Sequence, residues 1–278
     1  MLGVNFGPCM AAPAEDGGVH IIKQRTYMAD QPNIYSESYK IRSDEIHPNG
    51  KASLQTVCNL FQEAAGNHAL QLNFDITQLK DRNLTWVLYR LNAQMQRYPE
   101  WRETVTVQTW PSRGDRLRAY RDYRLLDADD NELGHGLSYW LMIDLDSRRP
   151  VRMPQEVIDM GVKGVEHVIP VRTDRLKAPK EVERKRPFSV RRSDLDVNRH
   201  VNNVKYIEWA LEAVPEAVYQ NREVQEIDIQ FEAESHYGDE IISACTLADT
   251  DNDLTEVQHA VRRTSDDKVV SVARSVWR

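Results

Sequence analysis

Hydrophobic residues recur in the same order twice along the chain. Apolar positions at steps of three and four run from Leu54 to His68 and again from Val204 to Val214, which predicts two helices that each bury one face. Alternating or β-branched runs after each helix predict four strands, at 85–95, 104–110, 118–127 and 135–144, and then at 225–234, 240–249, 255–263 and 269–278. Pro215 is expected to end the second helix, because proline cannot continue the hydrogen-bond ladder.

The two halves also resemble each other in sequence. YKIRSDEIHPNG at 39–50 aligns with FSVRRSDLDVNRH at 188–200, and each segment precedes one of the predicted helices. The turn sequences Asp-Asp-Asn at 129–131 and Ser-Asp-Asp at 265–267 are typical of consecutive antiparallel strands. The sequence therefore predicts an α+β fold made of two tandem repeats, each an antiparallel sheet that covers one long helix.

The repeats and the segments around them predict the domain organisation. We expect an N-terminal extension at 1–35, a first repeat domain at 36–160, a basic linker at 161–186 and a second repeat domain at 187–278. Between positions 172 and 192 the chain carries nine basic residues against three acidic ones, although its net charge is −7. This stretch is either a solvated linker or a docking site for an acidic partner. A second basic group is Arg113, Arg116, Arg118 and Arg121.

Composition excludes several classes of protein. Apolar residues make up 41% of the chain and charged residues 28%, which is typical of an ordinary folded protein. The negative net charge argues against a nucleic-acid binder. The cysteines at 9, 58 and 245 lack the spacing of a zinc or redox site, so we expect no metal and no cofactor. We find no signal or transit peptide and no apolar run of about 18 residues, which predicts a cytoplasmic protein without a membrane span.

The segment before the second helix carries three polar residues at a spacing of two, namely Asp196, Asn198 and His200. In an extended segment their side chains would lie on one side and bring a carboxylate, an amide and an imidazole together. The same residues also suit an Asx turn with a helix cap, which is a purely structural use. The first repeat favours chemistry, because its equivalent turn lacks the trio and has Ile46, Pro48 and Gly50 at the aligned positions.

The run RRSDLDVNRHVNNVKYIEWALEAVP at 191–215 resembles the signature of plant and bacterial acyl-acyl carrier protein (acyl-ACP) thioesterases, which carry D-x-N-x-H at the start of the second hot-dog helix. LQTVCNLFQEAAGNHA and YWLMIDLDSRRPVRMPQEV resemble the N-terminal domain of that family, so the resemblance covers roughly 36–278. It implies a tandem double hot-dog fold and hydrolysis of fatty acyl-ACP in fatty acid biosynthesis. Three alternatives stay open: an acyl-CoA thioesterase, a hot-dog 3-hydroxyacyl thioester dehydratase, and a catalytically silent acyl-binding protein.

The resemblance also implies the site residues. Glu234 in FEAES matches an acidic residue of the family's second active-site strand, and the trio Asp196, Asn198 and His200 would be catalytic. Plant members commonly carry cysteine after this acid, whereas this chain has Ser235. We therefore expect attack by a water molecule that a carboxylate and the histidine assist, with Ser235 in a supporting role only. Which carboxylate accepts the proton of the water stays open.

Substrate binding needs two further features. Backbone N–H groups near Val201 and Asn202, at the positive end of the helix, are expected to stabilise the oxyanion. Burial of the acyl chain stabilises binding by about 0.8 kcal/mol per methylene, so chain-length selection requires a closed apolar pocket. The resemblance implies a pocket in the first repeat, at Val57, Phe61, Ala65, Trp86 and Met95. The expected partner is acyl carrier protein, and the chain is expected to be a monomer or a homodimer.

Overall fold

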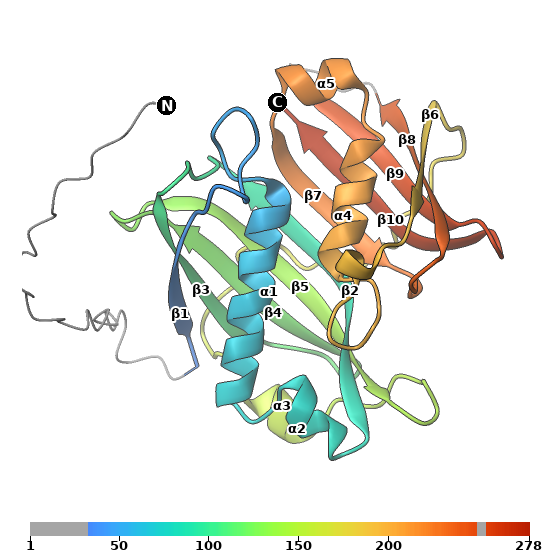
Figure 1. The fold of residues 1–278 in the computed structure, drawn as a ribbon. Helices are drawn as coiled ribbons and strands as arrows, with labels where there is room; N and C mark the ends of the chain where they lie inside the picture. The colour runs from blue at the N-terminus through green and yellow to red at the C-terminus, as the bar shows by residue number, and fades with distance from the viewer. Residues whose placement is uncertain (1–32, 249–253) are drawn as a thin grey trace, which may run out of the picture. The chain divides into compact units, whose positions relative to one another are not determined.

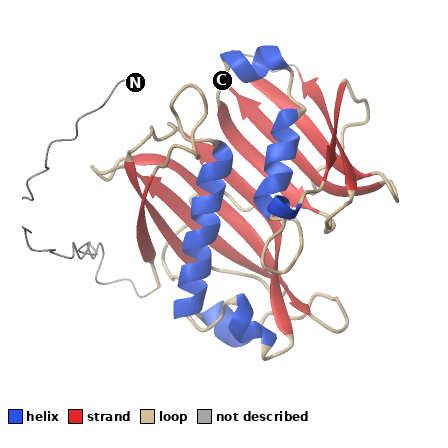
Figure 2. Ribbon diagram, viewed as in Figure 1, coloured by secondary structure: helices blue, strands red, loops and turns tan. Residues whose placement is uncertain are grey.

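The computed structural model describes residues 33–248 and 254–278, so most of the predicted N-terminal extension lies outside the described residues. The described residues form a ten-stranded sheet with two long helices on one side of it (Figures 1 and 2). The strand order is β1-β3-β4-β5-β2-β7-β10-β9-β8-β6, and neighbouring strands are antiparallel. The first five strands in this order come from the first repeat and the last five from the second.

The four strands predicted after the long helix of each repeat lie where alternation predicted them, with bounds that differ by no more than three residues, and one further strand precedes each helix. The first repeat contributes β1 (Tyr35–Lys40), β2 (Leu84–Met95), β3 (Thr104–Ser112), β4 (Arg118–Leu126) and β5 (Glu132–Asp144). The second contributes β6 (Arg184–Ser189), β7 (Val224–Phe231), β8 (Glu240–Ala248), β9 (Thr255–Arg263) and β10 (Lys268–Trp277). From the outer edge to the centre of the sheet, the order is β1-β3-β4-β5-β2 in the first repeat and β6-β8-β9-β10-β7 in the second. Corresponding strands thus occupy the same places, which confirms the tandem repeat. β6 extends across the expected domain boundary at 186/187.

Each repeat packs one long helix against its half of the sheet. α1 (Leu54–Gln71) begins at Ser53, whose side chain accepts a hydrogen bond from the N–H of Thr56, and the predicted apolar face is buried. α4 (Asn203–Glu212) is shorter, and Pro215 then serves as the N-cap of α5 (Glu216–Asn221). The apolar residues of both helices belong to one continuous core. Two short helices, α2 (Ile76–Lys80) and α3 (Gln155–Asp159), were not predicted.

The two repeats are joined along β2 and β7, which pair from Arg90↔Gln230 to Gln94↔Glu226. Inside this seam Arg90 donates to Asp228 through Nε at 2.8 Å and through Nη2 at 2.7 Å. Both residues are almost completely buried, with exposures of 1% and 0%. Charge pairing at this depth is required because an isolated buried charge is strongly unfavourable. The seam therefore carries a specific ionic contact in addition to backbone pairing.

The predicted basic linker covers part of the sheet face that lies opposite the helices. Ile169 packs with Tyr120, Leu137 and Tyr139 of the first repeat. Farther on, Arg172 Nη1 lies 2.7 Å from Asp228 Oδ2 and Arg175 Nη2 lies 2.5 Å from a carboxylate oxygen of Glu232. Arg172 pairs with an acid of β7, and Arg175 pairs with the residue that follows β7, so ion pairs attach this part of the linker to the sheet.

Among the described residues, none of the helices is both long enough and apolar enough to cross a bilayer.

Candidate active site

A cleft of about 840 Å³ lies where the two repeats meet. Residues of β2 and β5 form its wall on the first repeat, and the turn before α4, the first residues of α4 and the segment after β7 form its wall on the second. The predicted residues that line it are Trp86, Asp196, Asn198, His200, Val201 and Glu234. The structure thus brings the three residues of the turn and the distant acid to one cleft.

The turn that carries the trio is tight rather than extended, which corrects the expected geometry. Asp196 closes it, because its Oδ1 accepts hydrogen bonds from the backbone N–H of Asn198 at 2.8 Å and of His200 at 3.2 Å. The N–H of Asp196 donates in turn to the carbonyl of His200 at 2.8 Å, and Arg199 takes a left-handed φ of 63°. The Asp196 carboxylate therefore organises the turn, while Asn198 and His200 are the residues it presents to the cleft.

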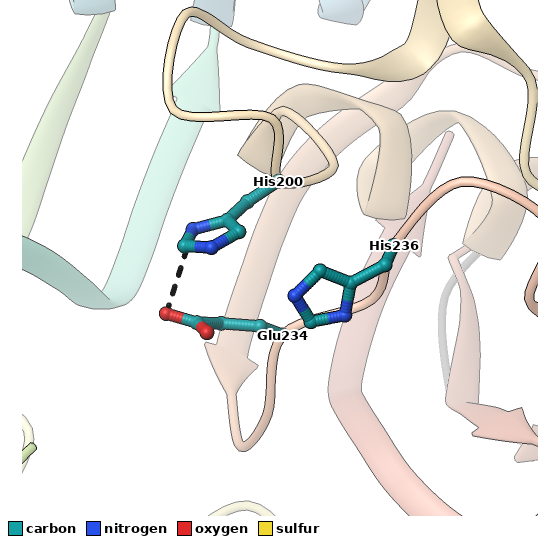
Figure 3. A group of neighbouring side chains, drawn as sticks. All are labelled: His200, Glu234 and His236. Carbon is teal, nitrogen blue, oxygen red and sulfur yellow. Dashed lines mark ion pairs between the residues drawn. The ribbon is translucent and has the colours of Figure 1, made fainter.

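Glu234 is the carboxylate that faces the histidine. It follows the end of β7, and its Oε1 lies 3.6 Å from Nδ1 of His200 (Figure 3). The other oxygen, Oε2, lies 2.5 Å from Nη2 of Arg148, which belongs to the turn after β5. A carboxylate next to an imidazole nitrogen can orient the ring and stabilise its charged form. The arrangement thus supplies a histidine base with an acidic partner, and the two come from separate segments.

His236 lies beside this pair, with its ring edge-on to that of His200 and 5.2 Å between the ring centroids (Figure 3). The ligand atoms of His200, Glu234 and His236 lie within 4.8 Å of one another, a grouping that could hold a metal ion. The guanidinium of Arg148 already neutralises Glu234 and would repel a cation there.

The predicted supporting residues have structural roles. The N–H of Val201 donates to the carbonyl of Ser235 at 3.1 Å, and the N–H of Asn202 donates to that of Asp194 at 2.8 Å. Neither amide is free in this structure to stabilise an oxyanion, so the expected donors are corrected. Asn202 instead caps α4, because its Oδ1 accepts from the N–H of Val204. Ser235 is 0% exposed, which places its hydroxyl out of reach of a carbonyl in the cleft.

Tyr206 lies on α4 at the inner wall of the cleft and is 3% exposed. Burial raises its pKa to about 12, so the phenol stays protonated at neutral pH and can donate a hydrogen bond. Tyr206 is six positions after His200 in the sequence, and it reaches the cleft only because of the side of α4 on which it lies.

The five expected acyl-pocket residues separate into two groups. Trp86 lines the cleft, and its Nε1 donates to the carbonyl of Phe74 at 2.8 Å. The other four are buried in the core around α1, where Phe61 stacks on Tyr123 with 4.7 Å between the ring centroids: Val57, Phe61, Ala65 and Met95. Trp86 packs against a smaller apolar cluster that includes Phe74 and Met142, which is separate from the core around α1.

Sequence reasoning missed the cations of the cleft. Arg148, Arg263 and Lys268 line it, and Arg263 Nη1 donates to the backbone carbonyl of Glu234 at 2.8 Å. Nothing in the local sequence distinguishes them from other exposed basic residues, because their importance depends on a contact between segments far apart in the chain.

Comparison with known families matches both repeats. Residues 32–160 match the model of the acyl-ACP thioesterase N-terminal domain, and residues 177–278 match that of the C-terminal domain. The chain is 31% identical over 241 residues to an oleoyl-acyl carrier protein thioesterase from Coriandrum sativum. That alignment covers 79% of this chain and 64% of the longer coriander protein.

Solved structures agree with the sequence comparison. An acyl-ACP thioesterase from Bacteroides thetaiotaomicron superposes with a TM-score of 0.77 at 27% identity, covering 88% of this chain and 98% of the other. A 12:0-ACP thioesterase from Umbellularia californica gives the same TM-score at 25% identity, covering 88% and 97% of the two chains. The tandem hot-dog architecture expected from the sequence is therefore confirmed.

Proposed function

Because the chain belongs to the acyl-ACP thioesterase family, we propose that it hydrolyses fatty acyl-ACP to a free fatty acid and ACP. The observation that carries this proposal is the pairing of His200 with Glu234 beside Asn198 in a cleft between the repeats. A thioester carbonyl in this cleft would meet a base, an acidic partner for that base and an amide. These are the groups that water attack on a thioester needs.

In the proposed reaction His200 takes a proton from a water molecule as the water oxygen attacks the thioester carbonyl. Glu234 faces Nδ1 of the ring and stabilises the imidazolium that forms. The tetrahedral intermediate then collapses with cleavage of the carbon–sulfur bond, and the imidazolium returns its proton to the departing thiolate. The products are a carboxylic acid and the thiol of the carrier, so atoms and charge balance. The 3.6 Å separation would shorten to a hydrogen bond when substrate is bound.

The oxyanion requires donors other than those expected from the sequence. Asn198 lines the cleft with a side-chain amide, and Asn203 lines it as the first residue of α4. The N–H of Asn203 is at the positive end of the helix, where negative charge is stabilised. We assign oxyanion stabilisation to these two groups. Asp196 acts indirectly by holding the turn that carries Asn198 and His200.

In this proposal the two repeats have different roles. The second, at 187–278, supplies the reacting groups, and the first, at 36–160, receives the acyl chain. Trp86 and Trp140 both line the cleft on the first repeat, and Trp140 packs against the apolar core around α1. The segment at 161–186 connects the two domains. Opening of the packed core around Phe61 would provide the closed apolar pocket that chain-length selection requires.

The deciding experiment compares saturated thioesters on different carriers. We expect purified protein to release free fatty acid from acyl-ACP with a higher kcat/KM than from acyl-CoA of the same chain length. A preference for acyl-CoA would reassign the enzyme to the acyl-CoA thioesterases of the same fold. Dehydration of 3-hydroxyacyl-ACP without release of thiol from a saturated substrate would point to a hot-dog dehydratase. Binding of acyl-ACP without any turnover would identify a silent acyl-binding protein.

A further inference from the structure

We infer that Arg148, from the first repeat, is a positioning residue for Glu234 and completes the active site across the seam between the repeats. The inference rests on the proposed function. Its basis is that Arg148 Nη2 lies 2.5 Å from Oε2 of Glu234, the acid that faces His200. The two residues are 86 positions apart in the chain.

The turn that presents Arg148 is held by its own polar contacts. Asp144 Oδ1 accepts from the N–H of Ser147 at 2.8 Å, and the N–H of Arg148 donates to the carbonyl of Asp144 at 2.9 Å. Asn83 fastens the turn to the start of β2, because its Nδ2 donates to Asp144 at 3.2 Å and to Asp146 at 2.9 Å. The backbone of Arg148 is left-handed, with a φ of 56°. The guanidinium thus projects from an ordered turn.

Arg148 and His200 use different oxygens of Glu234. The guanidinium takes Oε2, which leaves Oε1 toward Nδ1 of His200. A carboxylate with one oxygen held in this way has fewer orientations available, so the second oxygen stays aimed at the imidazole. Without Arg148, the half-exposed side chain of Glu234 would rotate away from His200 into solvent, and the imidazolium that forms during water attack would lose its partner.

The other groups around Glu234 do not duplicate this contact. Arg263 donates to the backbone carbonyl of Glu234 rather than to its carboxylate. His236 contacts the ring of His200 edge-on. Burial raises the pKa of Tyr206 on α4 to about 12, so its hydroxyl stays protonated and carries no charge. Among the described residues, Arg148 is thus the one cation whose side chain pairs with the carboxylate of Glu234. The first repeat thereby contributes to catalysis as well as to binding of the acyl chain.

The test compares Arg148→Ala and Arg148→Lys with Arg149→Ala, a control that removes the adjacent exposed arginine of the same turn. With a saturated acyl-ACP, R148A should lower kcat about tenfold or more and change KM by less than about twofold, because a charge-assisted hydrogen bond is lost at the reacting groups only. R148K should recover most of the rate. Recovery of the rate by lysine, together with an unchanged KM, distinguishes a positioning role from a general loss of structure.

A double-mutant cycle with Glu234→Gln shows whether Arg148 acts through the acid. We expect R148A to cost little further activity in the E234Q background, because the contact is already broken there. Equal kcat values for R148A and R149A would overturn the inference, and so would full additivity of R148A with E234Q. Absence of acyl-ACP hydrolysis by the wild-type enzyme would instead refute the proposed function. The experiment thus distinguishes a failure of the role given to Arg148 from a failure of the proposed function.

Discussion

Arg90 of β2 and Asp228 of β7 form a two-pronged ion pair at the centre of the sheet, with Arg172 as a second cation on the same carboxylate. The three residues come from the first repeat, the second repeat and the segment between them. One buried contact thus fastens all three parts of the chain together, and the cleft lies at the same seam between β2 and β7.

Asp228→Asn should destabilise the protein by about 3–5 kcal/mol, because it removes the buried counter-charge of Arg90 and leaves only the exposed carboxylate of Asp174 at 3.9 Å. The free energy of unfolding from urea titration measures this effect. Glu156→Gln is the matched control, since its pair with Arg82 is exposed and should contribute less than about 1 kcal/mol. Similar small changes in both variants would show that the seam does not depend on the ion pair.

Glu234→Gln should lower kcat about 10²-fold or more with little change in thermal stability, because the residue is partly exposed and its loss affects the reaction rather than the core. Hydrolysis of a saturated acyl-ACP and the melting temperature are the two measurements. Glu232→Gln is the control, because this carboxylate pairs with Arg175 instead of facing the histidine. An E234Q enzyme as active as E232Q would remove Glu234 from the mechanism.

Asp196→Asn and Asp196→Ala should differ, because only asparagine keeps an oxygen that can accept the two hydrogen bonds of the turn. We expect D196A to lose activity about 10²-fold and D196N to stay within about tenfold of the wild type, as judged by kcat on acyl-ACP. Equal loss in both variants would mean that the charge of Asp196 takes part in the chemistry directly.

Trp86→Ala should shift the released fatty acids toward longer chains, because it opens room between the cleft and the first repeat. Each added methylene would gain about 0.8 kcal/mol of burial. Chain lengths are read from the fatty acids released by a host that makes acyl-ACP. Trp101→Ala, at a 46% exposed position outside the residues that line the cleft, should leave the product distribution unchanged. The same distribution from both variants would exclude Trp86 from the acyl pocket.

The protein should lose stability as the pH falls from 7 to 5, in part through His259. Burial lowers the pKa of His259 to about 4, whereas an unfolded histidine has a pKa near 6.5, so the unfolded chain binds the extra proton in this interval. Burial and Arg121 lower the pKa of His68 to about 3, which acts in the same direction. Between pH 7 and pH 5, the free energy of unfolding from urea titration should fall by about 2 kcal/mol less in His259→Gln than in the wild type. An unchanged loss would contradict this assignment.

Much of the fold followed from local pattern. The strand from 104 and the strand from 255 begin where alternation begins, because a half-buried strand must place apolar residues on one face only. The predicted faces of α1 and α4 are buried for the same reason at a period of 3.6 residues. The short helices α2 and α3 were missed, since five residues carry too little periodicity to recognise.

The candidate site was predictable only where its residues are neighbours in the chain. Asp196, Asn198 and His200 were found by comparison with the first repeat, but the predicted alignment was wrong by one residue. The N–H of His47 donates to the carbonyl of Lys51 as that of Asp196 donates to His200, so the equivalent residues are His47, Asn49 and Lys51 instead of Ile46, Pro48 and Gly50. The first repeat thus keeps the asparagine of this turn but lacks the aspartate and the histidine at the matching positions. The mistaken oxyanion donors show the limit of this reasoning, since the backbone partners of Val201 and Asn202 are fixed by the fold and not by helix polarity. Arg148 carried no local signal, because its contact with Glu234 exists only after the two repeats have joined.

By itself, the sequence determined the repeat, its strands and helices, the polar turn and, through its resemblance to a family, the expected chemistry. Periodicity and turn composition act over a few residues and can be read directly along the chain. The tertiary structure alone decided that β2 pairs with β7, that Arg172 enters the seam, and that Glu234 stands between His200 and Arg148. These contacts depend on the packing of distant segments, and no local propensity encodes them.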